Sequence, residues 1–268
     1  MAFDPASAAL DRLQLDACGL YCALAHIASA SKAGDPEKEP TLGGKLLYAG
    51  ELDSHGRAVV IAGNVAGCAT LTSSAEVPAQ KLAIRDGVVD FVVTSLDEAL
   101  RILKNEVRKC AAVAVCVSAA PTCVEREMIE RGVLPDLLFE GTHYGRRDAP
   151  ECGPRTSIVE LTAPDAGLAF VTWQVTQAPA RWMPRLDEIA QDCLRSDLSA
   201  RRWIRLSPHY GGRGAQSRRV VFCETDAAKL IVSRFAAQAQ DGGIETEVLA
   251  SLSIGGETEV FRWAPVRT

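Results

Sequence analysis

Apolar positions in the first half of the chain fall into two alternating patterns, short buried runs and longer segments with helical spacing. The segments with helical spacing predict helices over residues 5–34, 56–66, 77–86, 95–105 and 121–131. The short runs predict strands over residues 45–49, 68–73, 88–93, 111–118 and 134–139. Alternation of this kind is typical of a parallel sheet with right-handed crossovers. We therefore expect an α/β fold, with a Rossmann-like parallel sheet and helices on both faces.

The segment from Gly56 to Ser73 allows two interpretations. Its valines and isoleucine favour two strands that are split at Gly63–Asn64. The alternative is a helix over residues 56–66 followed by a strand over residues 68–73. We adopt the helix because it continues the alternation seen further along the chain.

The pattern changes after His143, where glycine, proline and charge predict a linker. Beyond it the expected elements are those of a smaller α+β domain. They are a hairpin of residues 157–162 and 168–176, helices over 184–195, 198–208 and 226–238, a strand over 220–223, and a hairpin of 247–253 and 257–263. The predicted domains are an N-terminal helical segment (1–42) that packs on a Rossmann-like domain (43–145), and the α+β domain (146–268).

Composition narrows the possible partners and location. The 268 residues carry a net charge of −5, so we expect no binding to nucleic acid or to anionic membranes. No apolar run approaches the roughly 20 residues of a spanning helix, and no basic segment precedes an apolar run near the start, so we expect a cytoplasmic protein. The nine cysteines are scattered without a CxxC pair, which argues against a disulfide framework.

A glycine-containing turn joins the first predicted strand to the helix after it, in the stretch "LLYAGELDSHGRA". Gly50 and Gly56 are placed where a backbone could approach a phosphate at a helix N-terminus. Glu51 and Asp53 lie between them and would repel a pyrophosphate. The stretch does not match GxGxxG, so by itself it is a weak indication of a nucleotide site.

Five stretches occur in an order and spacing that resemble the central cofactor domain of urocanases, the NAD-dependent urocanate hydratases. They are "GKLLYAGELDSHGRA", "TSSAEV", "VDFVVTSLDEAL", "VCVSAAPTCVERE" and "GVLPDLLFEGTH". Upstream, "GLYCALAHIA" is also similar to the family, so the resemblance covers about residues 19–143. It implies NAD as cofactor, acting in that family as an electrophile that accepts the imidazole ring of the substrate while water adds to its side chain.

The resemblance also implies which residues would contact the dinucleotide. These are Gly50, Ser54, Gly56, Ser74, Glu76, Ser118, Ala119, Glu140 and Thr142. The sequence departs from the family in several turns, with Leu52, Asp53 and Ser54 at positions of family glycines and Gly141 at that of a glutamine. We therefore expect a divergent urocanase-like protein with a Rossmann-type small-ligand site but without urocanate hydratase activity. The alternatives are a hydro-lyase that uses NAD on a small conjugated acid, and a non-enzymatic binding or regulatory module or partner subunit.

Other residues are candidates for chemistry or binding. His143 and Tyr144 follow the last strand of the expected sheet, and His55 lies in the glycine turn, so these three are the catalytic candidates. The candidates for anion binding are the arginines of a basic, glycine-containing stretch, Arg213, Arg218 and Arg219. Cys18, Cys22 and His26 share a helix face, but we interpret that face as packing and expect no metal site. The expected partner is a small anionic molecule or a nucleotide, with a homodimer as a further possibility.

Overall fold

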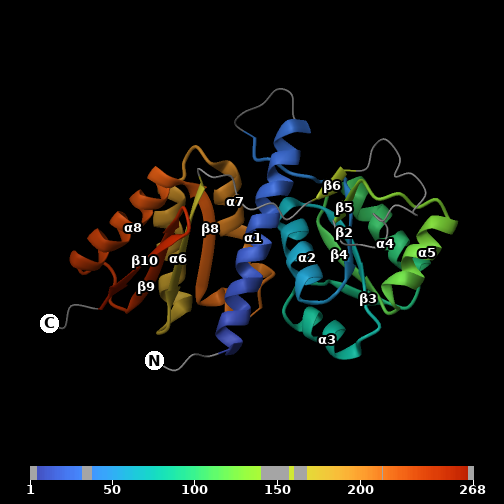
Figure 1. The fold of residues 1–268 in the computed structure, drawn as a ribbon, viewed down its shortest axis with the longest axis horizontal. Helices are drawn as coiled ribbons and strands as arrows, with labels where there is room; N and C mark the ends of the chain where they lie inside the picture. The colour runs from blue at the N-terminus through green and yellow to red at the C-terminus, as the bar shows by residue number, and fades with distance from the viewer. Residues whose placement is uncertain (1–4, 32–37, 140–156, 160–167, 213, 265–268) are drawn as a thin grey trace. The chain divides into compact units, whose positions relative to one another are not determined.

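A computed structural model describes residues 5–31, 38–139, 157–159, 168–212 and 214–264 of the chain (Figure 1). Contacts divide the chain into two compact units, Met1–Thr162 and Ala163–Thr268. The first unit contains a parallel sheet and the second an antiparallel one. Among the described residues, no helix combines the length and the apolar character that crossing a lipid bilayer requires.

The sheet of the first unit has the order β3-β4-β2-β1-β5-β6, and every pair of neighbours is parallel. Its strands are β1 (Leu46–Glu51), β2 (Ala69–Ser73), β3 (Phe91–Val93), β4 (Val113–Val117), β5 (Leu137–Phe139) and β6 (Ser157–Val159). Its helices are α1 (Pro5–Ser31), α2 (Ser54–Ala66), α3 (Val77–Arg85), α4 (Leu96–Lys109) and α5 (Pro121–Glu130). The expected α/β fold with a Rossmann-like parallel sheet is therefore confirmed.

Helices cover both faces of this sheet. On one face, side chains of α4 and α5 such as Leu103 and Met128 form a core with Tyr48, Leu71 and Val115. Because side chains alternate between faces along a strand, Leu47 and Thr70 point to the opposite face. There α2 packs so closely that a Cβ on Gly63 would lie 2.7 Å from Leu47 Cδ2 and from Thr70 Oγ1. The continuous burial of β2 and β4 follows from this double coverage.

Local signals in the sequence fix the ends of two helices. Asp53 precedes α2 in extended backbone, and its side chain accepts hydrogen bonds from the first turn of the helix. This settles the ambiguous segment as a helix, and the alternative of two strands is wrong. Ser95 caps α4 by accepting from the Glu98 N–H, while the Glu98 carboxylate accepts from the Thr94 N–H at 3.4 Å. These two bonds resemble a capping box, with the return bond shifted by one residue.

The second unit has a four-stranded antiparallel sheet in the order β10-β9-β7-β8. Its strands are β7 (Leu168–Val175), β8 (Arg218–Glu224), β9 (Val248–Ile254) and β10 (Glu257–Trp263), and its helices are α6 (Pro179–Cys193), α7 (Leu198–Leu206) and α8 (Thr225–Gln240). Short 3₁₀ turns, η2 (Ser207–His209) and η3 (Gly214–Gln216), connect α7 to β8. The predicted hairpin of β9 and β10 about Gly255–Gly256 is confirmed.

The other predicted hairpin, of residues 157–162 with 168–176, is wrong. β6 pairs in parallel with β5 and extends the first sheet, whereas β7 pairs with β8 and β9 of the second sheet. The division between the two units accordingly comes after β6. Two neighbouring apolar segments look alike whether they pair with each other or with separate sheets, so the pattern could not show the difference.

Candidate functional site

The candidate site lies at the carboxyl edge of the parallel sheet, beside β1. After β1 the chain forms β2, β3 and β4, which all lie on one side of β1 in the sheet. It then forms β5 on the other side of β1. In doubly wound sheets, ligands bind outside the carboxyl ends of the strands where the strand order reverses in this way. The turns that follow β1, β2 and β4, together with the end of β5, therefore define the candidate site.

Gly50 and Gly56, both expected to contact a cofactor, shape the turn between β1 and α2. Gly50 has a φ of 72°, and β1 shifts its register against β2 between Tyr48 and Glu51. A side chain at Gly50 would be strained in this left-handed backbone. At Gly56 a Cβ would lie only 1.8 Å from the Glu51 carbonyl oxygen. Both glycines are thus required by the close approach of the helix to the strand.

The carboxylate of Asp53 occupies the N-terminus of α2. Its Oδ1 accepts hydrogen bonds from the N–H groups of His55 at 2.9 Å and Gly56 at 2.8 Å. In dinucleotide-binding folds such N–H groups, at the positive end of the helix dipole, bind the pyrophosphate. Here a negative group of the chain itself satisfies them. Both N–H groups therefore have an acceptor within the chain.

Leu52 and Ser54 lie where the resemblance to urocanases implied glycines, and the structure shows what surrounds each of them. Leu52 is buried, with 1% of its surface exposed, and its N–H donates to the Ser73 carbonyl at 2.9 Å. The hydroxyl of Thr72 donates to the Gly50 carbonyl at 2.9 Å, which gives the turn a second bond to the end of β2. Ser54 is exposed as the first residue of α2. The turn is therefore closed onto β2 by hydrogen bonds and by a buried leucine.

His55, a catalytic candidate, lies where the strand order reverses. Its ring contacts that of Phe139, the last residue of β5, with centroids 4.7 Å apart and planes inclined by 60°. Because β5 is the neighbour of β1 in the sheet, this contact spans the two strands at the reversal. His55 is half-buried, so part of the imidazole remains accessible at the edge. Sequence reasoning missed Phe139, although its place at the end of the last predicted strand could have indicated it.

Two further residues of the predicted set, Ser74 and Ser118, are brought together by Gln80. The Gln80 Nε2 group donates to the Ser74 carbonyl at 2.7 Å and to the Ser118 hydroxyl at 3.0 Å. It thereby joins the turn after β2 to the turn after β4. Gln80 was missed at the sequence level, although it lies three residues before Ala83 on the buried face of α3.

Glu76 and Ala119 lie in the same two turns. Glu76 is exposed just before α3, where its side chain makes no capping hydrogen bond, and its N–H donates to the Ser74 hydroxyl at 3.2 Å. Ala119 is half-buried, and its N–H donates to the Val117 carbonyl at 2.9 Å. Of this pair, only Glu76 presents a functional group to solvent at the edge.

Ionisable groups beneath the edge are held in their neutral forms. Tyr48 is fully buried, and its hydroxyl donates to Glu125 Oε1 at 3.1 Å. Burial raises the pKa of Tyr48, and the charge of Glu125 raises it further. Burial also raises the pKa of the Cys116 thiol to about 12, with a smaller contribution from Glu51. Neither the phenol nor the thiol is therefore activated as a base or a nucleophile near neutral pH.

Five predicted residues lie outside the described part of the chain. They are the cofactor-contact candidates Glu140 and Thr142, the catalytic candidates His143 and Tyr144, and the anion-binding candidate Arg213. For these residues the sequence-based expectation stands without a structural test.

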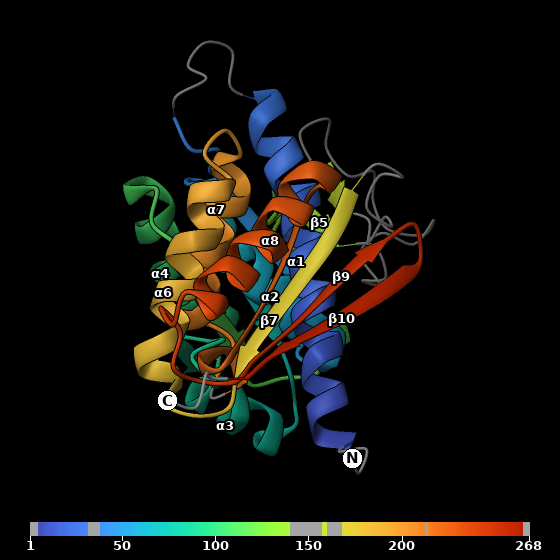
Figure 2. The ribbon, with the colours of Figure 1, turned by 90° about the vertical axis from the view of Figure 1, so that its left-hand side faces the viewer.

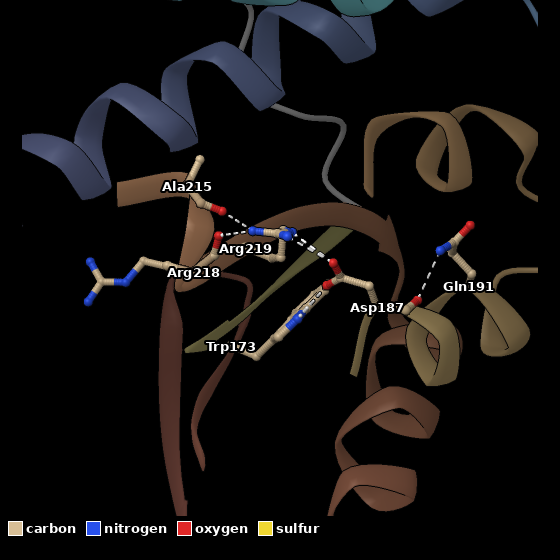
Figure 3. Close-up of polar contacts among 6 residues, drawn as sticks. All are labelled: Trp173, Asp187, Gln191, Ala215, Arg218 and Arg219. Atoms are coloured by element: carbon tan, nitrogen blue, oxygen red, sulfur yellow. Dashed lines mark hydrogen bonds and ion pairs between the residues drawn. The ribbon is translucent and has the colours of Figure 1, made fainter. Parts of the chain in front are cut away.

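The remaining anion-binding candidates, Arg218 and Arg219, lie in β8 of the second unit (Figure 3). Arg219 is 7% exposed, and its Nε and Nη2 atoms lie 3.0 and 2.9 Å from Asp187 Oδ2. Its Nη1 atom donates to the carbonyls of Ala215 and Arg218. A carboxylate and two carbonyls of the chain itself thus bind the Arg219 guanidinium, so its burial needs no external anion.

Burial dominates the ionisation of this pair. Desolvation raises the pKa of Asp187 to about 6, although Arg219 and a hydrogen bond of 3.1 Å from Trp173 Nε1 oppose the shift. Desolvation likewise lowers the pKa of Arg219. Arg218 is half-buried, and its Nε donates to Gln174 Oε1 at 2.7 Å. Both arginines therefore interact with side chains of their own unit.

Within the described ranges, no three or more histidine, cysteine, aspartate or glutamate residues lie close enough to hold a metal ion. On α1, Cys18 is buried and His26 is exposed, so these two side chains lie in different environments. The sequence was also compared with models of known protein families, and no family model matches it.

Proposed function

We propose that this protein is a divergent urocanase-like protein whose Rossmann-type domain binds a small polar ligand at the carboxyl edge of its sheet. In this proposal it does not act as an NAD-dependent urocanate hydratase. One observation carries the proposal: the Asp53 carboxylate takes the N–H groups of His55 and Gly56. A dinucleotide would need those groups for its pyrophosphate.

Electrostatics gives the size of this effect. Two like charges about 4 Å apart repel by roughly 1 kcal/mol in water and about 4 kcal/mol near a protein surface. Displacing the carboxylate from the helix would cost a further 1 kcal/mol or so, the usual value of an N-cap. The sum of about 2–5 kcal/mol corresponds to a loss of roughly 30-fold to several thousandfold in affinity for a pyrophosphate.

The accessible groups of the edge suggest what kind of ligand would bind. Ser54, His55 and Ser118 offer hydroxyls and an imidazole, while Asp53 and Glu76 contribute negative charge. A ligand with several hydrogen-bonding groups and at most one negative charge fits this set, such as a nucleoside or a small monocarboxylic acid. The protonated, buried Tyr48 and Cys116 favour binding over catalysis, because neither is available to react.

Thermal shift measurements test the proposal. NAD⁺, NADH and ADP-ribose should leave the melting temperature unchanged, whereas a ligand at 100 times its Kd stabilises by about 2.7 kcal/mol. For a chain of this size, at roughly 2–4 °C for each kcal/mol, that corresponds to a shift of about 5–11 °C. Adenosine and urocanate serve as probes without a pyrophosphate. A clear shift with NAD⁺ in the unmodified protein would refute the proposal.

The variant Asp53→Ser tests the stated reason. Serine retains a good N-cap but removes the negative charge, so the helix should stay folded while the repulsion disappears. We expect this variant to bind ADP-ribose more tightly than the unmodified protein. The matched control is Asp97→Ser, which removes an exposed carboxylate from the first turn of α4 and should not change binding.

A second candidate is a hydro-lyase that uses NAD on a small conjugated acid. The observation in its favour is that Gly50 and Gly56 both remain where the backbone requires glycine. Loss of the ultraviolet absorbance of urocanate, dependent on added NAD⁺ and on the protein, would favour this candidate. Such turnover would refute the first proposal. Its absence over a long incubation would exclude urocanate hydratase activity.

A further inference from the structure

The strands at the edges of the two sheets differ in how they are protected. Among the described residues the edge strands are β3, β6, β8 and β10. β3 and β6 have three residues each. β8 is longer, but α7 packs beside it, and the indole N–H of Trp203 donates to the Val220 carbonyl at 2.7 Å. Short or covered edge strands are ways in which proteins avoid pairing with other chains.

Among the described residues, β10 is neither short nor covered, and its charged residues are Glu257, Glu259 and Arg262. It has seven residues, and its register with β9 runs from Glu257 to Trp263 without a shift. It contains neither proline nor lysine, and among the described residues it pairs with β9 alone. Figure 2 shows it on the outer side of β9. Val260, at its centre, is 67% exposed, the highest value among the large exposed apolar side chains of the described residues.

We propose that β10 pairs in antiparallel fashion with β10 of a second copy of this chain, about a two-fold axis at Val260. The four-stranded sheet of the second unit then continues into an eight-stranded sheet across the dimer. This arrangement leaves no unpaired outer strand at that side of either sheet. It is an isologous contact, in which each copy presents the same strand to the other.

The charge pattern of the strand is compatible with self-pairing in this register. With the axis at Val260, all seven residues are paired, and Glu257, Thr258 and Glu259 lie opposite Trp263, Arg262 and Phe261 of the second copy. Like charges directly opposite each other destabilise antiparallel strands, and this register contains no such pair. An axis at Glu259 or at Arg262 would place each of these residues opposite its own copy.

The size of the contact sets its strength. A single pair of seven-residue strands buries less than the roughly 1,200–2,000 Å² of a stable protein interface. We therefore expect a monomer–dimer equilibrium that depends on concentration, with a Kd in or above the micromolar range. A dimer of this kind escapes detection in dilute solution.

Sedimentation velocity over a wide range of protein concentration tests the proposal. The unmodified chain should shift from monomer to dimer, and Val260→Lys should weaken association at least tenfold, because two ammonium groups would then face each other. The matched control is Val77→Lys on α3, where the valine is 50% exposed, and this variant should associate like the unmodified chain. Tryptophan fluorescence of Val260→Lys checks that the second unit is still folded.

Hydrogen exchange locates the contact independently of any variant. Amides of β10 should become more protected as the protein concentration rises, while those of β3 should not change. A chain that stays monomeric up to the highest soluble concentration overturns the proposal. So does a dimer that Val260→Lys leaves intact or that Val77→Lys weakens equally.

Discussion

The buried pair of Asp187 and Arg219 gives the sharpest test of how the second unit is held together (Figure 3). Replacing Arg219 with methionine keeps much of the side-chain volume but leaves the Asp187 carboxylate without its cation. Removing one partner of a buried ion pair typically costs about 3–5 kcal/mol. That is a large part of the roughly 5–15 kcal/mol by which a domain is stable. The double variant Asp187→Leu/Arg219→Met should recover most of this loss, because no buried charge remains.

The pair also predicts a pH dependence of definite sign. The pKa of Asp187 is raised from 3.8 to about 6 by burial, so the folded chain holds this proton more tightly than the unfolded chain does. Between about pH 4 and pH 6 the unfolded chain has lost the proton and the folded chain has not. The contribution of this group to the free energy of unfolding therefore falls as pH rises, by at most about 1.4 kcal/mol per pH unit. It is constant above that window.

Urea unfolding followed by tryptophan fluorescence measures both effects. All four tryptophans, at positions 173, 182, 203 and 263, belong to the second unit, so the signal reports on that unit alone. Subtracting the unfolding free energy of Asp187→Asn from that of the unmodified protein isolates the titration of Asp187. The difference should fall from pH 4 to pH 6. A loss below about 1 kcal/mol in Arg219→Met, or a difference that rises with pH, would refute the reasoning.

Two further predictions concern the first unit. Gly56→Ala should lower the free energy of unfolding by at least about 3 kcal/mol or prevent folding, because its Cβ would meet the Glu51 carbonyl at 1.8 Å. The control is Gly132→Ala, where the Cβ would have open space. It should cost only about 1–2 kcal/mol, for the left-handed backbone with a φ of 64°. Thermal melting compares the two, and equal losses would contradict the packing argument. Gln80→Ala should cost about 1–3 kcal/mol, because it leaves the buried Ser74 carbonyl without its amide donor, while Lys81→Ala on the same helix should be neutral. Hydrogen exchange should then show faster opening of the turns after β2 and β4, and unchanged rates would argue against the bridging role.

Some features of the candidate site could be predicted because their signals are local. Gly50 and Gly56 follow a buried strand and enter a helix, and the backbone does require glycine at both positions. Asp53 was recognised as a charge that would repel a pyrophosphate. Its role as the cap of α2 could also have been inferred, because an aspartate before a helix commonly binds the N–H groups of the first turn.

Other features of the site depend on residues that are distant in the chain. Gln80 reaches a serine 38 residues away, and the contact of His55 with Phe139 exists because β5 returns beside β1. No spacing in the sequence encodes these neighbours. Arg218 and Arg219 were candidates for anion binding because they lie in a basic, glycine-containing stretch. The partner of Arg219 is Asp187, which lies 32 residues earlier in the chain.

The sequence by itself determined the alternation of strands and helices, and with it the parallel sheet of the first unit. Periodicity and helix caps depend on residues a few positions apart, so they can be read along the chain. Only the tertiary structure decided that β6 joins the first sheet, that Gln80 joins two turns and that Arg219 is internally paired. These outcomes depend on which segments meet in space. The sequence of an apolar segment, or the identity of a charged residue, does not specify which distant residue it will contact.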